Sequence, residues 1–167
     1  LKIIRDGKKN FLVNNNITGY KNDDRLRVVL FTPDDLYMVK GAPFLRRDFM
    51  DFALKQVSED YNFHWNRYKR ILRKRNELLR NYETGKSTYP IINEMFIDHA
   101  CRVIMARINF VNILDEIDNK VYKKINQVDE QLKIRYAISF PIDSGKINID
   151  ALKQAMVDYL NQIRDLE

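Results

Sequence analysis

The sequence predicts an α+β fold, mostly α, in which a long antiparallel helical hairpin, a coiled-coil-like arm, stands on a small antiparallel sheet with short helices. Three observations lead to this prediction. Apolar and polar residues alternate near the start of the chain, as they do in strands. Two later segments repeat their seam positions at alternating spacings of four and three, as coiled-coil helices do. Turn-forming residues separate these segments, so the second helix can fold back along the first.

The composition is that of a folded protein. Of 167 residues, 45% are hydrophobic, 31% are charged and 11% are aromatic, which excludes an intrinsically disordered chain. No apolar run approaches the roughly 20 residues of a membrane span. Cys101 is the single cysteine, which excludes an internal disulfide and suits a reducing compartment. We therefore expect a cytoplasmic protein.

Residues 1–57 are predicted to form the base of the molecule. Residues 1–13 alternate around Asp6-Gly7, a pair that favours a two-residue hairpin turn. Residues 27–31 are a short β-rich run, which we expect to form a buried strand. These segments are the source of the predicted sheet.

A short helix is predicted to follow. Thr32, Pro33 and Asp35 stand where a helix start places a capping hydroxyl, a first-turn proline and a carboxylate. Gly41 is expected to end this helix in the left-handed conformation, and Pro43 begins the next helix.

Residues 58–128 are predicted to form the arm, with Ser58 as its N-cap. A break at residues 85–90 separates its two helices, and folding back there would place Tyr68 against Arg107 and Arg75 against Ala100. Each seam thus contains one arginine, which would mark the register at a cost in stability. The two seams run through Tyr61, Trp65, Tyr68, Leu72, Arg75, Leu79 and Tyr82, and through Phe96, Ala100, Val103, Arg107, Phe110, Leu114, Ile117 and Val121.

Residues 129–167 are predicted to contain a return strand at 132–138 and a last helix capped by Asn148. The apolar positions Leu152, Met156, Tyr159 and Ile163 would form one face of that helix. The chain begins without methionine, and its last residues are still helical in pattern without a stop signal. We therefore expect parts of a longer protein on both sides.

No catalytic residue, cofactor site or metal site is predicted, so the chain is not expected to be an enzyme. Gly85-Lys86-Ser87 is like the end of a phosphate-binding loop, but that loop needs a strand in front and a glycine where Arg80 stands. His64, His99 and Cys101 lack the spacing of a zinc site, and a core or surface role is favoured. No nucleophile and base stand in a catalytic arrangement.

The basic character of the chain is concentrated in one stretch. Seven basic residues and one acidic residue lie between Arg67 and Arg80, which equals the net charge of +6 of the whole chain. The repulsion between like charges one turn apart and the attraction of Glu77 to its basic neighbours nearly cancel, at roughly 0.2–0.5 kcal/mol per pair. The helix can therefore expose this charge to solvent without any partner. On charge alone, DNA binding is the less favoured alternative.

Two runs of residues resemble hallmark segments of the RecF family. The first, from Arg27 to Asp51, joins a hydrophobic strand to Thr-Pro-Asp-Asp-Leu, then Val-Lys-Gly, then Arg-Arg-Asp-Phe-Met-Asp. The second, from Tyr68, reads Tyr-Lys-Arg-Ile-Leu-Arg-Lys-Arg-Asn and is followed closely by Leu-Leu. Met50 and Lys74 replace the usual Leu and Gln of the family. The match is dense over residues 26–80 and collinear at both flanks.

The resemblance implies a middle fragment of an SMC-like ABC ATPase, with residues 1–57 at the edge of its head. Members of the family bind ATP with Mg²⁺, form dimers through their heads, and bind DNA at gaps and single/double-strand junctions. With RecO and RecR they help to load RecA, in recombinational repair and the SOS response. Their Walker A motif precedes this segment and their signature and Walker B motifs follow it. This fragment is therefore expected to bind DNA and to support the parent protein structurally, and not to catalyse a reaction.

Seven basic residues are candidate contacts to DNA phosphates. Arg47 could instead pair with Asp51, and Lys40 could simply occupy a helix end. The rival hypothesis is a protein-interaction arm that docks RecR, RecO or a second protomer, while the head alone holds DNA. The candidates are Lys40, Arg46 and Arg47 in the base and Arg67, Arg70, Arg73 and Lys74 in the arm.

Overall fold

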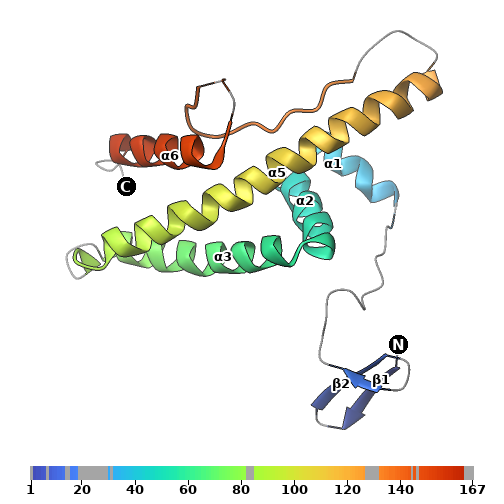
Figure 1. The fold of residues 1–167 in the computed structure, drawn as a ribbon, viewed down its shortest axis with the longest axis horizontal. Helices are drawn as coiled ribbons and strands as arrows, with labels where there is room; N and C mark the ends of the chain where they lie inside the picture. Colours follow the sequence, from blue (N-terminus) through green and yellow to red (C-terminus); the bar gives the residue numbers. More distant parts are fainter. Residues whose placement is uncertain are drawn as a thin grey trace. The chain divides into compact units, whose positions relative to one another are not determined.

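The protein is described by a computed structural model that covers residues 2–6, 8–13, 16–18, 30, 32–81, 85–126, 132–143, 145 and 147–163 (Figure 1). The chain divides into two compact units, Leu1–Glu59 and Asp60–Glu167, and each is described by itself. No helix among these residues combines the length and the apolar character that crossing a membrane requires.

The first unit begins with a small antiparallel sheet in the order β1-β2-β3. The predicted hairpin is present, because β1 pairs with β2 and Asp6 stands opposite Lys8. Pairing continues from β2 to β3, where Phe11 is opposite Thr18. The strands are β1 (Lys2–Asp6), β2 (Lys8–Val13) and β3 (Asn16–Thr18). The strand predicted at residues 27–31 lies outside the described residues except for Leu30, which is in no strand.

Short helices complete the first unit: the 3₁₀ turn η2 (Pro33–Leu36), α1 (Tyr37–Lys40) and α2 (Pro43–Val57). The predicted helix start at Thr32 is confirmed, because the Asp35 carboxylate accepts hydrogen bonds from the Thr32 backbone N–H and hydroxyl. Gly41 is extended, with φ −90° and ψ −170°, so the predicted left-handed conformation is wrong. Glycine is needed because a Cβ there would collide with the carbonyl oxygen of Tyr37.

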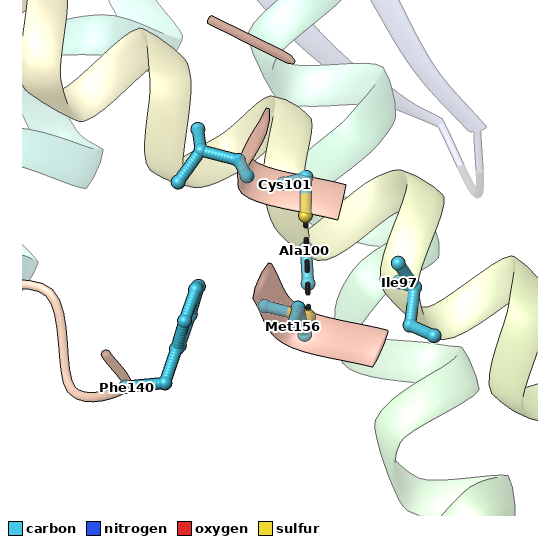
Figure 2. Packing of buried hydrophobic residues seen from close by; sticks show 6 residues of the cluster. Ile97, Ala100, Cys101, Phe140 and Met156 are labelled. Carbon is cyan, nitrogen blue, oxygen red and sulfur yellow. Dashed lines mark hydrogen bonds between the residues drawn. The ribbon is translucent and has the colours of Figure 1, made fainter. Parts of the chain in front are cut away.

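The second unit is built from α3 (Glu59–Arg80), α5 (Tyr89–Asn126) and α6 (Ile149–Ile163). The α3 and α5 helices run antiparallel, as predicted, while α6 packs on α5 (Figure 1). The Asn148 side chain caps α6, because its Oδ1 accepts a hydrogen bond from the backbone N–H of Ala151 at 2.9 Å. The core cluster joins α5, α6 and the segment before α6, and consists of Ile97, Ala100, Cys101, Phe140, Leu152 and Met156 (Figure 2).

The predicted α+β fold class is wrong as a description of this chain. From residue 30 onward, the described residues contain helices and turns but no strand. The core cluster of the second unit, among the described residues, comes from helices apart from Phe140. The small sheet belongs to the first unit, whereas in the second unit the arm packs against the helix α6.

The return strand predicted at residues 132–138 is an extended segment without strand pairing. Its alternation is real, because Ile134, Tyr136 and Ile138 are partly buried and the residues between them are exposed. The inward side chains meet a helix, however, and the backbone N–H of Ile134 donates to Asp115 Oδ1 of α5 at 2.6 Å. A period of two indicates one buried face and does not identify what covers it.

The register predicted for the arm is also wrong. Arg107 contacts Tyr61, seven residues before the predicted partner Tyr68, and Tyr68 lies against the ring of Phe96. The seam of α3 is also rotated toward the side of His64, and its buried residues are Tyr61, His64, Ile71, Arg75 and Leu78. Arg75 and Arg107 stabilise this register, because each donates hydrogen bonds to residues of the opposite helix.

Truncation of Leu152 should test the core. Its side chain is 0% exposed, so Leu152→Ala should lower the free energy of unfolding by about 2–5 kcal/mol. Leu132→Ala, at a position that is 44% exposed, is the matched control and should change it by less than about 0.5 kcal/mol. Urea titrations followed by far-UV circular dichroism measure both. Equal losses in the two variants would contradict the position assigned to the core.

Candidate functional site

The outer face of α3 presents four of the predicted DNA contacts. Arg67, Arg70, Arg73 and Lys74 are all exposed. At 100° per residue they occupy about a third of the helix circumference, on the side away from the buried seam. We call these four residues the α3 basic face. The structure brings them together on one helix, as the sequence predicted, and their contact with DNA stays a prediction.

Aromatic rings lie close to two cations of α3. The Arg67 guanidinium lies 5.4 Å from the ring centroid of Phe63, which is itself 52% exposed. The ammonium of Lys69, which is next to the α3 basic face in sequence, lies 4.5 Å from the centroid of the Trp65 ring. Such exposed cation–π pairs are worth about 0.5–1 kcal/mol, so a phosphate can compete for these cations.

Acidic neighbours neutralise little of this face. Lys74 Nζ lies 3.3 Å from Glu77 Oε2, and both side chains are more than half exposed. An exposed ion pair of this kind is worth about 0–1 kcal/mol. Lys74 therefore remains available to a ligand.

The three candidates in the first unit have different surroundings. Arg46 donates hydrogen bonds to the carbonyl oxygens of Met38 and Gly41 at 3.0 and 3.1 Å, which satisfies the end of α1. This contact gives Arg46 a structural role that its sequence position did not indicate. Lys40 and Arg47 are exposed, and their roles, including the alternative pairing of Arg47 with Asp51, stay predictions.

Two other arginines, one from each predicted seam, are buried between α3 and α5, but their partners differ from the predicted ones. Arg75 is 4% exposed and donates to Asn93 Oδ1 at 2.8 Å and to the Tyr89 hydroxyl at 3.0 Å. The acceptors of Arg75 are thus Asn93 and Tyr89, whereas the predicted register placed Arg75 against Ala100. Arg107, 9% exposed, donates to the Tyr61 hydroxyl at 3.3 Å. A buried charge needs such partners, because leaving it unpaired costs several kcal/mol.

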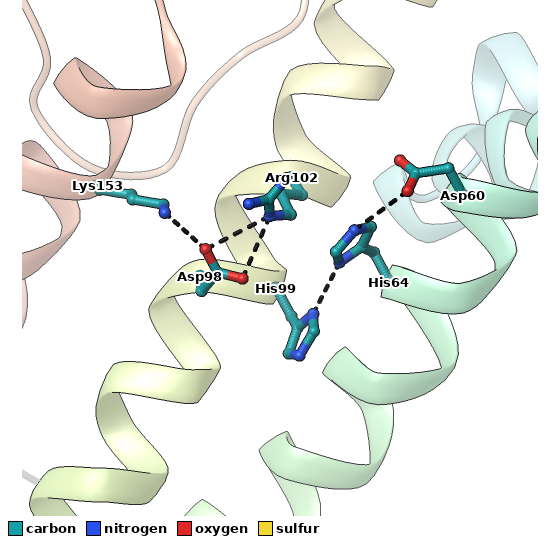
Figure 3. A network of polar contacts seen from close by, with 6 residues as sticks. All are labelled: Asp60, His64, Asp98, His99, Arg102 and Lys153. Carbon is teal, nitrogen blue, oxygen red and sulfur yellow. Dashed lines mark hydrogen bonds and ion pairs between the residues drawn. The ribbon is translucent and has the colours of Figure 1, made fainter.

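A polar network crosses the same interface nearer the middle of the arm (Figure 3). The Nδ1 atoms of His64 on α3 and His99 on α5 are 2.8 Å apart. His64 Nε2 lies 3.4 Å from Asp60 Oδ1, one turn earlier on α3. Burial lowers the pKa of His99, and the nearby His64 lowers it further, so neutral imidazole is favoured at this position.

Asp98, next to His99, connects α5 to α6. Lys153 Nζ lies 2.6 Å from Asp98 Oδ1, and Arg102 Nε lies 3.2 Å from Oδ2. Burial alone would raise the pKa of Asp98, but the hydrogen bonds and charges of Lys153 and Arg102 outweigh it and lower that pKa. His64, Asp98 and His99 each offer a ligand atom, and these atoms lie within 4.8 Å of one another. Sequence spacing missed this cluster because its members come from two helices.

Two other motifs of the sequence have simple structural roles. Gly85 lies in the turn between α3 and α5, where a Cβ would meet the Leu78 side chain at 2.6 Å. Lys86 and Ser87 follow in the same turn, as the hairpin interpretation predicts. Cys101 is 0% exposed, and burial raises its pKa to about 11, so it remains a protonated thiol at neutral pH.

Comparison with known proteins identifies relatives over nearly the whole chain. The chain is 33% identical to the DNA replication and repair protein RecF of Enterococcus faecalis over 167 residues, or 98% of this chain. It is 32% identical to the protein of the same name from Ligilactobacillus salivarius over 174 residues. The chain is a RecF homologue. It spans 44% and 45% of the lengths of these two RecF proteins, so it corresponds to less than half of each. No protein-family model matches the sequence.

Solved RecF structures share this fold. A structure of the recombination mediator protein RecF–ATPrS in the RecFOR pathway aligns with a TM-score of 0.82 at 23% identity. A RecF–ATP structure from the same pathway aligns with a TM-score of 0.75. Both alignments cover 95% of this chain and 43% or 44% of the solved chain. At this identity the likeness establishes the fold alone, and the RecF resemblance seen in the sequence is confirmed by the curated relatives.

Removal of one hydroxyl should test the buried arginine contacts. Tyr61→Phe leaves the Arg107 guanidinium without this acceptor, so the free energy of unfolding should fall by about 1–3 kcal/mol. Tyr159→Phe is the control, because no hydrogen bond of its hydroxyl is found within the described part of the chain. Chemical denaturation measures both variants. A loss for Tyr159→Phe as large as that for Tyr61→Phe would contradict the prediction.

The Asp98 network should make stability depend on pH. Because its folded pKa lies below the ordinary value of 3.8, the ionised Asp98 stabilises the fold above that value. This contribution is lost as the pH falls through the folded pKa. Asp98→Asn should therefore lower the melting temperature at pH 7 and leave it nearly unchanged near pH 2. A melting-temperature difference that is equal at both pH values would contradict this assignment.

Proposed function

We propose that this chain is the DNA-binding and bracing module of a RecF-type recombination mediator. In this proposal the whole protein acts in the cytoplasm at gaps and single/double-strand junctions, helps RecO and RecR to load RecA, and contributes to the SOS response. ATP and Mg²⁺ belong to the remainder of a dimeric parent, and this module binds without catalysing. The relatives named DNA replication and repair proteins support the general role.

The α3 basic face is the observation on which the DNA contact rests. Its four cations are exposed on one side of a helix whose other side is anchored to α5 by Tyr61, His64 and Arg75. A rigid row of cations matches a phosphate backbone without the cost of ordering a loop. Phosphate contacts of this type give affinity and position, and they read no sequence. Binding should therefore be strong at low salt and steeply salt-dependent.

Neutralisation of the α3 basic face should show whether DNA binds at this surface or is attracted only by the net charge of the protein. Arg67→Ala, Arg70→Ala, Arg73→Ala and Lys74→Ala combined remove four charges from α3. In the matched control the same number of exposed charges is removed at Lys120, Lys124, Lys133 and Arg135. The measurement is fluorescence anisotropy with a junction oligonucleotide from 25 to 200 mM KCl.

The α3 variant should lose most of the binding at low salt. Its slope of log affinity against log salt should also decrease by about 3–4, because roughly 0.9 counterion is released per phosphate contact. The control variant should keep most of the affinity and of the slope. Equal losses of affinity in both variants would show that DNA binding depends only on net charge. Unchanged affinity in both variants would exclude the α3 basic face as the DNA-binding surface.

A second candidate function is the protein-interaction arm. It is supported by an apolar stripe on the second half of α5, where Ile113, Ile117, Val121 and Ile125 are between 47% and 72% exposed. Exposed apolar side chains one turn apart are typical of helix docking surfaces. Retained binding to RecR, RecO or a second copy, with no DNA binding even at 25 mM KCl, would favour this function.

A further inference from the structure

We infer that His64, His99 and Asp98 form a binding site for a divalent transition-metal ion of the zinc class, held between α3 and α5 (Figure 3). The chain contains only two histidines. They come from different helices, 35 residues apart in sequence, and their Nδ1 atoms lie 2.8 Å apart. Imidazole is the commonest protein ligand of such ions, and the convergence of both histidines on one point defines the site.

Asp60 gives His64 the tautomer that a metal requires. With His64 Nε2 at 3.4 Å from Asp60 Oδ1, the ring proton is favoured on Nε2, and the His64 Nδ1 lone pair accepts the Nδ1 proton of His99. When the ion binds, His99 releases that proton and carries its remaining ring proton on Nε2. A carboxylate behind a metal-binding histidine is the usual way to orient the ring and raise its basicity. Asp60 is therefore a positioning residue that does not touch the ion itself.

The spacing of the ligand atoms suits a tetrahedral ion. Zinc–nitrogen bonds of about 2.0–2.1 Å place two ligating nitrogens roughly 3.3 Å apart, so the two rings must separate by only about half an ångström. Asp98 offers the third ligand atom within the same 4.8 Å group. A water molecule would supply the fourth, as in other sites with three protein ligands.

Lys153 and Arg102, which both contact Asp98, repel a metal ion and so restrict the kinds of ion that can bind here. Lys153 at 2.6 Å can remain on Oδ1 while the metal takes Oδ2, where Arg102 lies at 3.2 Å with a side chain that is 46% exposed. Arg102 must then turn into solvent. This competition disfavours Mg²⁺ and Ca²⁺, which bind mainly through carboxylate charge, and leaves ions that bind imidazole strongly. The opposing interpretation is a plain histidine–histidine hydrogen bond that only joins the helices.

Bound metal would join the two helices of the arm. Since the ligands meet only in the folded hairpin, binding stabilises the folded state by mass action. Arg67 of the α3 basic face lies nearby, because the Phe63 ring contacts both its guanidinium and the His64 ring. None of the proposed ligands belongs to that face, so the inference does not depend on DNA binding.

Titration of the whole chain with Zn²⁺ and Co²⁺ tests the site. Zinc chloride should raise the melting temperature, and Co²⁺ should give the visible absorption of a tetrahedral complex. His64→Gln and His99→Gln should each abolish both signals, and Asp60→Asn should weaken zinc binding by about 10–100-fold. Asp98→Asn should also weaken it, whereas Glu94→Gln, an exposed carboxylate one turn earlier on α5, should leave it unchanged.

Far-UV circular dichroism without metal shows whether each histidine variant has folded before its titration is interpreted. If a histidine variant does not fold, Asp60→Asn against Glu94→Gln decides the matter. A wild-type chain whose melting temperature is unmoved by zinc would overturn the inference. So would a folded His64→Gln variant with the wild-type response, or equal affinities for Asp60→Asn and Glu94→Gln.

Discussion

Two buried guanidinium groups, Arg75 of α3 and Arg107 of α5, constrain how the arm can assemble. Each has been taken out of water, and each finds oxygen acceptors on the opposite helix: Asn93 and Tyr89 for Arg75, and Tyr61 for Arg107. A slip of either helix along the other would take these acceptors away from the guanidinium groups, and a buried charge that loses a partner is costly. Apolar seams alone tolerate such slips more easily, because one aliphatic contact is similar to another. The polar contacts therefore determine the register, and with it the side of α3 that remains in solvent.

In the described part of the second unit, α5 contacts α3, α6 and the extended segment at residues 132–138. One side of it meets α3 through His99, while Asp98, the preceding residue, reaches Lys153 of α6. The core cluster lies between α5 and α6, and the extended segment at residues 132–138 packs along α5 as well. Because neighbouring residues of one helix contact different partners, α3 and α6 are both placed by α5. The buried residues of α3 contact α5 while the four cations of the α3 basic face stay exposed, so one helix can brace the hairpin and present cations at the same time.

Sequence patterns predicted most features that depend on near neighbours. The hairpin of β1 and β2, the helix start at Thr32, the Asn148 cap and the two helices of the arm are all present, because each depends on residues within a turn or two. The exposure of Arg67, Arg70, Arg73 and Lys74 was also predictable, since a helix with that many charges must turn them toward water. The conformation of Gly41 was predicted wrongly although it is local, because glycine also allows close approach of a carbonyl group without a positive φ.

The sequence by itself determined that this chain has long amphipathic helices, a concentrated basic stretch and the two segments that resemble RecF. Only the tertiary structure decided that Arg75 is buried, that the alternating residues 132–138 pack on a helix, and that His64 meets His99. The physical reason is the range of the interactions. Helix periodicity and capping arise from residues close in sequence, whereas these three contacts join positions from 14 to 35 residues apart, and periodicity gives the direction of a side chain without naming its partner.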